Sequence, residues 1–294
     1  MEDVVTVGLD GSAESLAAAR WAASEADRRR LTLRLMHAWV LLAAAPKGIP
    51  AERDQNYWAE RIVHDAAKEL HRRHPELPII EDLVAEEASS ALLGAAAQSR
   101  MLVLGSRGLR AIESFFLGDI SLYVTARAEQ PVVLVRAAED TTAGGGEPAS
   151  AAGRTGVVVG LSLHGPCERL MEFAFDTAAG RGVPVDAVHG TSLPVAAYAP
   201  WGVDPDVADE FRHGAEKQLN EALRPWQERF PGVRVTGTVV LESPARALLH
   251  AAGEAELLAI GRRLHRPPMA PHLGPVAHAA MHHAMCPVAV VPHD

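Results

Sequence analysis

Short apolar runs rich in β-branched residues alternate along this chain with segments in which apolar residues recur every three or four positions. In the first half, the apolar runs predict strands at 4–7, 31–37, 79–84, 101–104 and 132–135. The amphipathic segments between them predict helices at 12–30, 51–74, 89–99 and 121–128. Runs that are apolar throughout are typical of parallel strands covered on both faces. The pattern therefore predicts a doubly wound α/β domain with about five parallel strands.

The second half of the chain repeats the first. His37 returns 152 residues later as His189, and Gly105 returns 156 residues later as Gly261. A repeat of this length is a whole domain rather than a solenoid unit. The repeated strands are expected at 157–159, 183–189, 233–241, 257–260 and 288–291. We therefore expect two tandem Rossmann-like α/β domains, each a mostly parallel five-stranded sheet with helices on both faces. Their expected bounds are 1–138 and 155–294, with a flexible glycine-rich linker at 139–154.

Composition narrows the class of protein. The chain has 294 residues, of which 48% are hydrophobic and 22% are charged, as is usual for soluble globular proteins. The net charge of −9 disfavours binding to nucleic acid, which needs a basic face. Two cysteines make no disulfide framework, and the start of the sequence lacks the pattern of a signal peptide. No apolar stretch is long enough to span a membrane. We therefore expect a cytoplasmic protein.

Residues suited to ligand binding follow two strands of the first half. Ligands of open parallel sheets bind beyond the carboxyl ends of the strands, near the point where strand order reverses. The residues expected there are Gly8, Asp10, Gly11 and Ser12 after the first strand, Leu104 at the end of the fourth strand, and Gly105, Arg107, Gly108, Gly118, Asp119, Ile120 and Ser121 after it. Glycines let backbone N–H groups approach an anion, and a helix start adds a favourable dipole. Each glycine is also a common turn residue, and Asp10 is also a common helix cap.

In combination, these residues resemble the universal stress protein family. Its signature is a glycine, two residues, a glycine, nine residues, and then a glycine with Ser or Thr, which matches Gly105, Gly108 and Gly118. The resemblance covers both halves and implies a tandem protein. It implies a module that binds ATP, with or without Mg²⁺, and it places Asp10 in the pocket and Ala38 against the adenine. It also implies a role in stress survival and pairing through the last strands, as a homodimer or between the two domains of one chain.

Departures from the signature separate the two halves. Asp119 stands where the family has Ser or Thr, and an ionised carboxylate cannot donate a hydrogen bond to phosphate. Asp119 therefore either weakens ATP binding by repelling phosphate, favours a ligand with fewer phosphates, or helps to hold a metal ion such as Mg²⁺. In the second half, Ser162 stands in place of Asp10, and Pro275 follows Gly274. Leu264 replaces the second glycine, and its side chain is expected to occupy space that phosphates would need. We therefore expect the first domain to bind the nucleotide, and the second to serve in packing or partner contact.

Three functions are compatible with these residues. The leading hypothesis is a nucleotide-binding regulatory protein of the stress response. The alternatives are a slow ATP hydrolase or phosphotransferase, and a nucleotide-free dimerising scaffold. The glycine loop contains no Gly-Lys-Ser/Thr, which argues against a designed NTPase. A metal site at His278, His282 and Cys286 is a weaker alternative, because the helix should end before Pro287.

Overall fold

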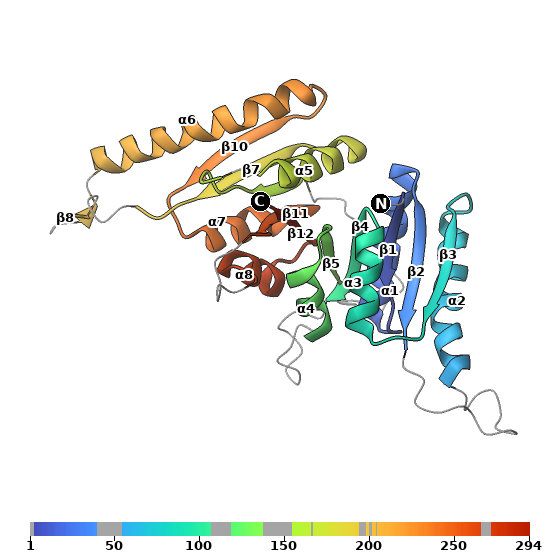
Figure 1. Ribbon diagram of the computed structural model, residues 1–294. Coiled ribbons are helices and arrows are strands. Elements are labelled where there is room, and N and C mark those ends of the chain that lie inside the picture. Colours follow the sequence, from blue (N-terminus) through green and yellow to red (C-terminus); the bar gives the residue numbers. More distant parts are fainter. Residues whose placement is uncertain are drawn as a thin grey trace, which may run out of the picture. The chain divides into compact units, whose positions relative to one another are not determined.

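The computed structural model describes residues 3–39, 55–106, 119–137, 155–165, 167–193, 198–199, 202–203, 205–265 and 272–294. The chain divides into two compact units, Met1–Ala149 and Ser150–Asp294, and each is described by itself (Figure 1). The linker expected at 139–154 lies outside the described residues. Among the described residues, no helix is both long and apolar enough to cross a membrane.

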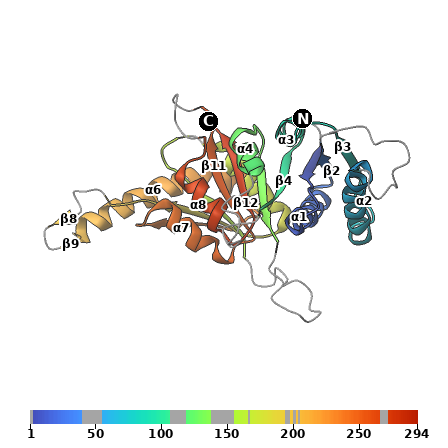
Figure 2. The ribbon, with the colours of Figure 1, turned by 90° about the horizontal axis from the view of Figure 1, so that it is seen from below.

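The first unit is a five-stranded parallel sheet covered by helices on both faces. Its strands are β1 (Val4–Gly8), β2 (Thr32–Ala38), β3 (Ile79–Val84), β4 (Met101–Ser106) and β5 (Val132–Arg136), in the order β5-β4-β1-β2-β3. Its helices are α1 (Ala13–Arg29), α2 (Gln55–Arg73), α3 (Ala88–Gln98) and α4 (Asp119–Arg127). Helices α1 and α2 pack together on one face, and α3 packs with α4 on the other (Figure 2). The doubly wound fold predicted for the first half is confirmed.

The apolar pattern explains these elements. Val5 and Val7 of β1 point to one face of the sheet and Thr6 points to the other, and none of the three has exposed surface, because helices cover both faces of this central strand. Helix α1 begins after Ser12, whose hydroxyl accepts a hydrogen bond from the N–H of Ser15. Serine is a favoured residue at the N-cap position of a helix, so this start agrees with the sequence. The elements begin and end within two residues of the predicted bounds, except that 51–54 of the second helix lie outside the described residues.

The second unit repeats this architecture. Its main sheet has the order β12-β11-β6-β7-β10, with all neighbours parallel. The strands are β6 (Val157–Gly160), β7 (Val185–Gly190), β10 (Val235–Val240), β11 (Leu257–Arg263) and β12 (Val288–His293). The helices are α5 (Glu168–Arg181), α6 (Pro205–Arg229), α7 (Pro244–Ala251) and α8 (Pro275–His283), with a 3₁₀ turn at Ala252–Glu254. In Figure 1, α5 and α6 cover one face of the sheet, and α7 and α8 cover the other.

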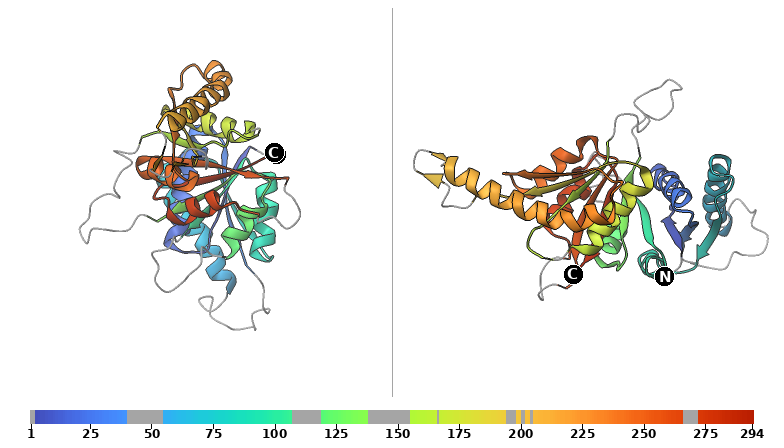
Figure 3. Two further views of the ribbon diagram at one scale, coloured as in Figure 1. Left: turned by 90° about the vertical axis from the view of Figure 1, so that its left-hand side faces the viewer. Right: turned by 90° about the horizontal axis from the view of Figure 1, so that it is seen from above.

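Helix α6 is longer than its counterpart in the first unit. Helix α6 has 25 residues, against the 19 described for α2, and its first turns extend past the sheet (Figure 3). A short antiparallel pair, β8 (Tyr198–Ala199) with β9 (Gly202–Val203), lies just before it in the chain. The other end of α6 is held by aromatic packing, because Trp226 and Phe230 lie 5.7 and 5.6 Å from the ring of Phe175 on α5.

Candidate functional site

A hydrogen-bonded turn joins β1 to α1 at the carboxyl end of the first sheet. One carboxylate oxygen of Asp10 accepts hydrogen bonds from the backbone N–H of Ser12 at 2.9 Å and from its hydroxyl at 2.5 Å. Gly11 has φ +81°, a left-handed conformation that glycine adopts without strain. The predicted residues Asp10, Gly11 and Ser12 are therefore brought together, and the exposed Asp10 side chain is held at the edge of the sheet.

A histidine fixes the same turn to the neighbouring strand. The Nδ1 atom of His37 lies 2.7 Å from the carbonyl oxygen of Leu9, and because a carbonyl only accepts, Nδ1 carries the hydrogen. The N–H of Leu9 donates in turn to the carbonyl of Met36. His189 makes the equivalent contact with Leu161 at 2.9 Å. The two repeats thus fix the first turn by the same device, and Ala38 ends β2 directly after that histidine.

Two of the predicted glycines are explained by packing. A Cβ atom on Gly8 would lie 2.8 Å from Leu104 and 2.9 Å from Leu92. A Cβ atom on Gly105 would lie 2.7 Å from backbone atoms of both Glu14 and Ser15 in the first turn of α1. All of these distances are shorter than those that real Cβ atoms show. The neighbours of Gly8 are the ends of leucine side chains, which can shift, whereas those of Gly105 are backbone atoms. Gly105 therefore admits α1, whatever else it does.

The remaining predicted residues are only partly placed. Arg107, Gly108 and Gly118 lie outside the described residues. Asp119 is the first residue of α4, and its side chain is not described. Ile120 is 42% exposed, and the carbonyl of Ser121 accepts a hydrogen bond from the hydroxyl of Thr125. The proximity of the glycine loop to Asp10 therefore stays a prediction.

Ser106 is a residue that the sequence did not single out. It is the last residue of β4, directly after Gly105, and its side chain is only 4% exposed. Its hydroxyl has no hydrogen-bond partner among the described residues. A buried serine cannot be recognised as unsatisfied from sequence, because this depends on what the fold packs around it.

The second unit has a cavity of about 610 Å³ at the carboxyl ends of its strands. It is lined by the ends of β6, β7 and β11 and by the start of α8, and its polar side chains include Ser162, His189, Arg263, His265 and His293. Gly274 is the N-cap residue of α8 and has no side chain that could bond to the first amide groups of the helix. Pro275 is the first residue of α8. Val276 and Ala277 of the first turn of α8 also line the cavity, and the first amide groups of a helix lack partners within the helix.

Leu264 does not close this cavity. We expected its side chain to occupy the space of a ligand, but it is not among the lining residues. The structural reason is that β11 continues to Arg263, paired with His293, and the N–H of Leu264 then donates to the carbonyl of His293. In this repeat, Leu264 stands at the position of the second glycine and continues the pairing of β11 with β12.

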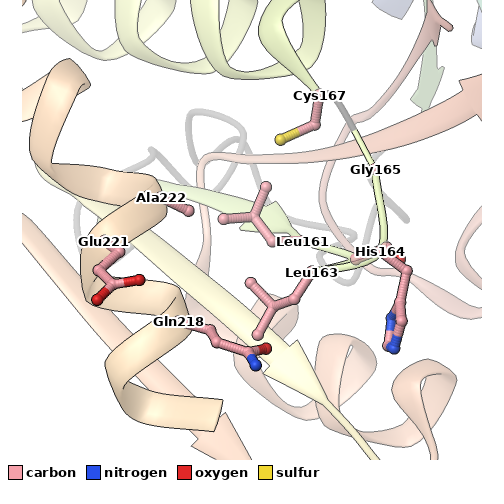
Figure 4. Close-up of a pocket in the computed structure, with 9 residues that line it drawn as sticks. Leu161, Leu163, His164, Gly165, Cys167, Gln218, Glu221 and Ala222 are labelled. Carbon is pink, nitrogen blue, oxygen red and sulfur yellow. The ribbon is translucent and has the colours of Figure 1, made fainter. Parts of the chain in front are cut away.

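Helix α5 begins later than its counterpart α1, and this leaves a second cavity beside the turn after β6. The residue 152 positions after Ala13 is Gly165, but α5 begins only at Glu168. A cavity of about 390 Å³ lies between residues 161–165 with Cys167 and α6 (Figure 4). Cys167 lines it, and burial, followed by the charge of Glu168, raises the pKa of its thiol. This thiol is therefore less acidic than an ordinary cysteine, which is the opposite of a reactive thiolate.

No metal centre is evident in the described parts of the chain. They contain no group of three or more His, Cys, Asp or Glu side chains suited to hold a metal ion. The rings of His278 and His282 stack at 4.6 Å on α8, whereas Cys286 lies beyond the end of that helix and is 2% exposed. The three residues considered as a metal site are therefore not assembled as one.

Comparisons with known proteins agree with this architecture. The profile of the universal stress protein family matches residues 1–136 and again 154–292. A universal stress protein of Mycobacterium tuberculosis is 32% identical over 293 residues, covering 97% of this chain and 96% of that protein. One from Mycolicibacterium smegmatis is 31% identical over 268 residues, covering 87% and 86%. The crystal structure of a universal stress protein from Archaeoglobus fulgidus shares the fold, with a TM-score of 0.62, 15% identity and full coverage of both chains. The chain belongs to the universal stress protein family and carries two tandem copies of its domain.

Proposed function

We propose that this protein is a nucleotide-binding regulator of the stress response, whose ligands lie at the carboxyl ends of the strands. In this proposal the first domain binds ATP at the turn of Asp10. The second domain also binds an anionic ligand rather than serving only in packing. Membership of the universal stress protein family supports a role in the stress response. The polar residues at the carboxyl ends of the strands support the proposed location of the ligands.

The observation that carries the proposal is the cavity of about 610 Å³ in the second domain. Ligand pockets in proteins commonly have volumes of about 300–1,000 Å³ and combine apolar walls with a few polar groups. Leu161, Pro244 and Leu248 provide apolar wall, and Arg263 and the start of α8 provide positive charge and N–H donors. This chain therefore keeps a ligand-sized space at the expected end of the sheet, even in the repeat with the altered signature.

The charge of Asp10 favours one orientation of the nucleotide in the first site. A carboxylate accepts hydrogen bonds from amino or hydroxyl groups, such as those of a base or ribose. It repels a phosphate charge about 4 Å away by about 1 kcal/mol in water, and by more where water is excluded. The base or ribose therefore lies toward Asp10, and the phosphates lie toward the start of α4. In the second domain the exposed Ser162 stands in this position, so that site lacks the repulsion.

Magnesium would enter the first site with the phosphates. In the described part of the chain, no three acidic, histidine or cysteine side chains converge to bind it alone. Asp10 already accepts two hydrogen bonds from Ser12. We therefore propose that phosphate oxygens supply most of the ligands of any bound Mg²⁺, as is usual for this ion.

Calorimetric titration of the full chain with ATP and Mg²⁺ tests the proposal. Asp10→Ala should weaken one binding site, and Arg263→Ala should weaken the other. Matched controls are Asp3→Ala, which removes an exposed carboxylate at the opposite end of β1, and Arg212→Ala on α6. Both controls should bind as the parent protein does. Absence of binding by the parent protein would reject the proposal and leave the nucleotide-free scaffold.

A further inference from the structure

The second domain lacks the helical turn that packs against Gly105 in the first domain. Gly105 of β4 meets backbone atoms of Glu14 and Ser15, which belong to the first turn of α1. The corresponding turn is missing from α5, which begins only at Glu168. Space therefore remains on the α5 face of the second sheet, beside the ends of β11 and β12.

A histidine takes part of this space, and the rest is a cavity. A Cβ atom on Gly261, the matching glycine of β11, would meet the imidazole of His293 and the side chain of Leu170 instead of backbone. A cavity of about 250 Å³ lies beside them, and we call it the α5 pocket. Cys167 and Leu170 line the α5 pocket but not the cavity of about 610 Å³. The two spaces are therefore distinct, although Arg263 and His293 border both.

Basic side chains predominate around the α5 pocket. Gly261 faces α5, and because side chains alternate along a strand, Arg263 points to the same face. Its guanidinium donates a hydrogen bond of 3.5 Å to the carbonyl of His164, across the turn after β6. His164, His265 and His293 add three imidazole groups to the lining. The described lining thus holds one permanent positive charge and three groups that become positive on protonation.

Two acidic residues lie close to the α5 pocket. Among the described residues that line it, Asp294 is the one carboxylate. This carboxylate lies 2.8 Å from Nδ1 of His265, and the main-chain oxygen of Asp294 lies 2.9 Å from Nδ1 of His293. Burial, followed by the charge of Glu168, raises the pKa of the Cys167 thiol, so the thiol adds no charge at neutral pH. Asp294 offsets one positive charge, and the pocket therefore becomes positive when the histidines are protonated.

We infer that the α5 pocket binds a small oxyanion, either inorganic phosphate or a phosphate group, between Arg263 and His293. A guanidinium and an imidazolium both donate hydrogen bonds to such an anion. A bound anion favours the protonated histidine, so the affinity is highest at acid pH and falls as the pH rises through the ordinary histidine pKa of about 6.5.

This site goes beyond the proposed function, because it lies outside the cavity that we assign to the ligand of the second domain and needs no nucleotide. It also belongs to the second repeat alone. In the first repeat, α1 packs over Gly105, and Ala137 stands in the position of His293.

Protection of Cys167 from a thiol reagent tests this inference. The chain has two cysteines, and Cys286 is only 2% exposed, so N-ethylmaleimide should modify Cys167 first. Sulfate is the probe, because it keeps its charge between about pH 6 and pH 8 while histidine titrates. At constant ionic strength, sulfate should slow the modification more than chloride does. The sulfate concentration that gives half protection should rise at least about tenfold from about pH 6 to about pH 8.

Two variants test the residues that hold the anion. Arg263→Ala should weaken protection by sulfate at every pH, whereas His293→Ala should mainly reduce its dependence on pH. Matched controls are Arg212→Ala and His213→Ala, which change exposed or half-buried side chains of α6 and should behave as the parent protein does. Rapid modification of Cys286 would reveal any variant that has unfolded. Calorimetric titration with sulfate should rank the folded variants in the same order.

ATP distinguishes the two sources of the oxyanion. Protection of Cys167 by ATP at concentrations far below those needed for inorganic phosphate assigns the oxyanion to a nucleotide in the neighbouring cavity. Protection by phosphate but not by ATP assigns it to the free ion. Sulfate and phosphate that protect no better than chloride would overturn the inference, and so would full protection in Arg263→Ala. Protection by sulfate in a protein that binds no nucleotide would reject the proposed function and leave this inference standing.

Discussion

Replacing Gly105 by alanine should destabilise the first domain because of helix packing, independently of any ligand. The new Cβ atom would lie 2.7 Å from the carbonyl carbon of Glu14 and from the backbone nitrogen of Ser15. Ordinary contacts of this kind begin near 3.4 Å, so α1 and β4 must separate locally by roughly 0.7 Å. Backbone atoms cannot rotate away as a side chain can. The expected cost is about 1–3 kcal/mol, as for other overpacked cores.

Two other glycines provide matched controls. Gly94 lies in the middle of α3 and is exposed, and a Cβ atom added there would have no described neighbour within 4 Å. Gly94→Ala should stabilise the domain by about 0.5–1 kcal/mol, because alanine is the better helix former. Gly261 is the repeat of Gly105, but a Cβ atom there would meet the imidazole of His293 instead of backbone. Gly261→Ala should therefore cost less than Gly105→Ala, because a side chain can shift.

Hydrogen exchange followed by mass spectrometry is the suitable assay. A protein of two domains need not unfold in a single transition, and exchange reports each domain separately. Gly105→Ala should speed exchange in β4 and α1 and leave β11 unchanged. Thermal unfolding should show the first domain melting lower by about 2–4 °C for each kcal/mol lost. A Gly105→Ala protein as stable as its parent would refute the packing argument, and the glycine would then need a ligand-based reason.

Three further predictions concern the turn and the thiol. Gly11→Ala should lower the stability of the first domain by about 1–2 kcal/mol, since φ is +81° there, and an unchanged melting temperature would contradict this. Asp10→Ala should lower ATP affinity and leave the rate of any ATP hydrolysis at saturating ATP unchanged. A loss of hydrolysis at saturating ATP would instead favour the enzyme alternative. Burial raises the pKa of Cys167 above its ordinary 9.0, so its contribution to stability is present at neutral pH and declines as pH rises above about 9. Cys167→Ser should flatten that alkaline decline in a pH series of unfolding curves, and an unaltered decline would assign it to other groups.

Most of the fold could be predicted because its signal is local. Apolar runs such as the one that forms β4 (Met101–Ser106) are buried on both faces, and this leaves little choice but a covered parallel strand. The histidines at 37 and 189 fixed the alignment of the repeat, and the structure gives them the same contact. The 25-residue length of α6 was not predicted, because Pro225 within it and the preceding loop carry no helical signal of their own.

The site could be predicted only where it depends on short-range chemistry. The Asp10–Ser12 turn is such a case, because its hydrogen bonds join residues two apart. The reason for Gly105 lies in α1, some ninety positions earlier in the chain, and no spacing rule contains it. Leu264 was expected to fill the second site, but its effect depends on how far β11 continues beside β12. The unpartnered hydroxyl of Ser106 likewise appears only when its surroundings are known.

Nucleotides should occupy the strand ends of this chain. The most direct test is to purify the protein natively, denature it, and quantify the released nucleotides per chain by chromatography and mass spectrometry. We expect at least about one nucleotide per chain, or the same uptake after ATP and Mg²⁺ are added to protein that was purified empty. Nothing released, followed by no uptake of added ATP with Mg²⁺, would contradict it.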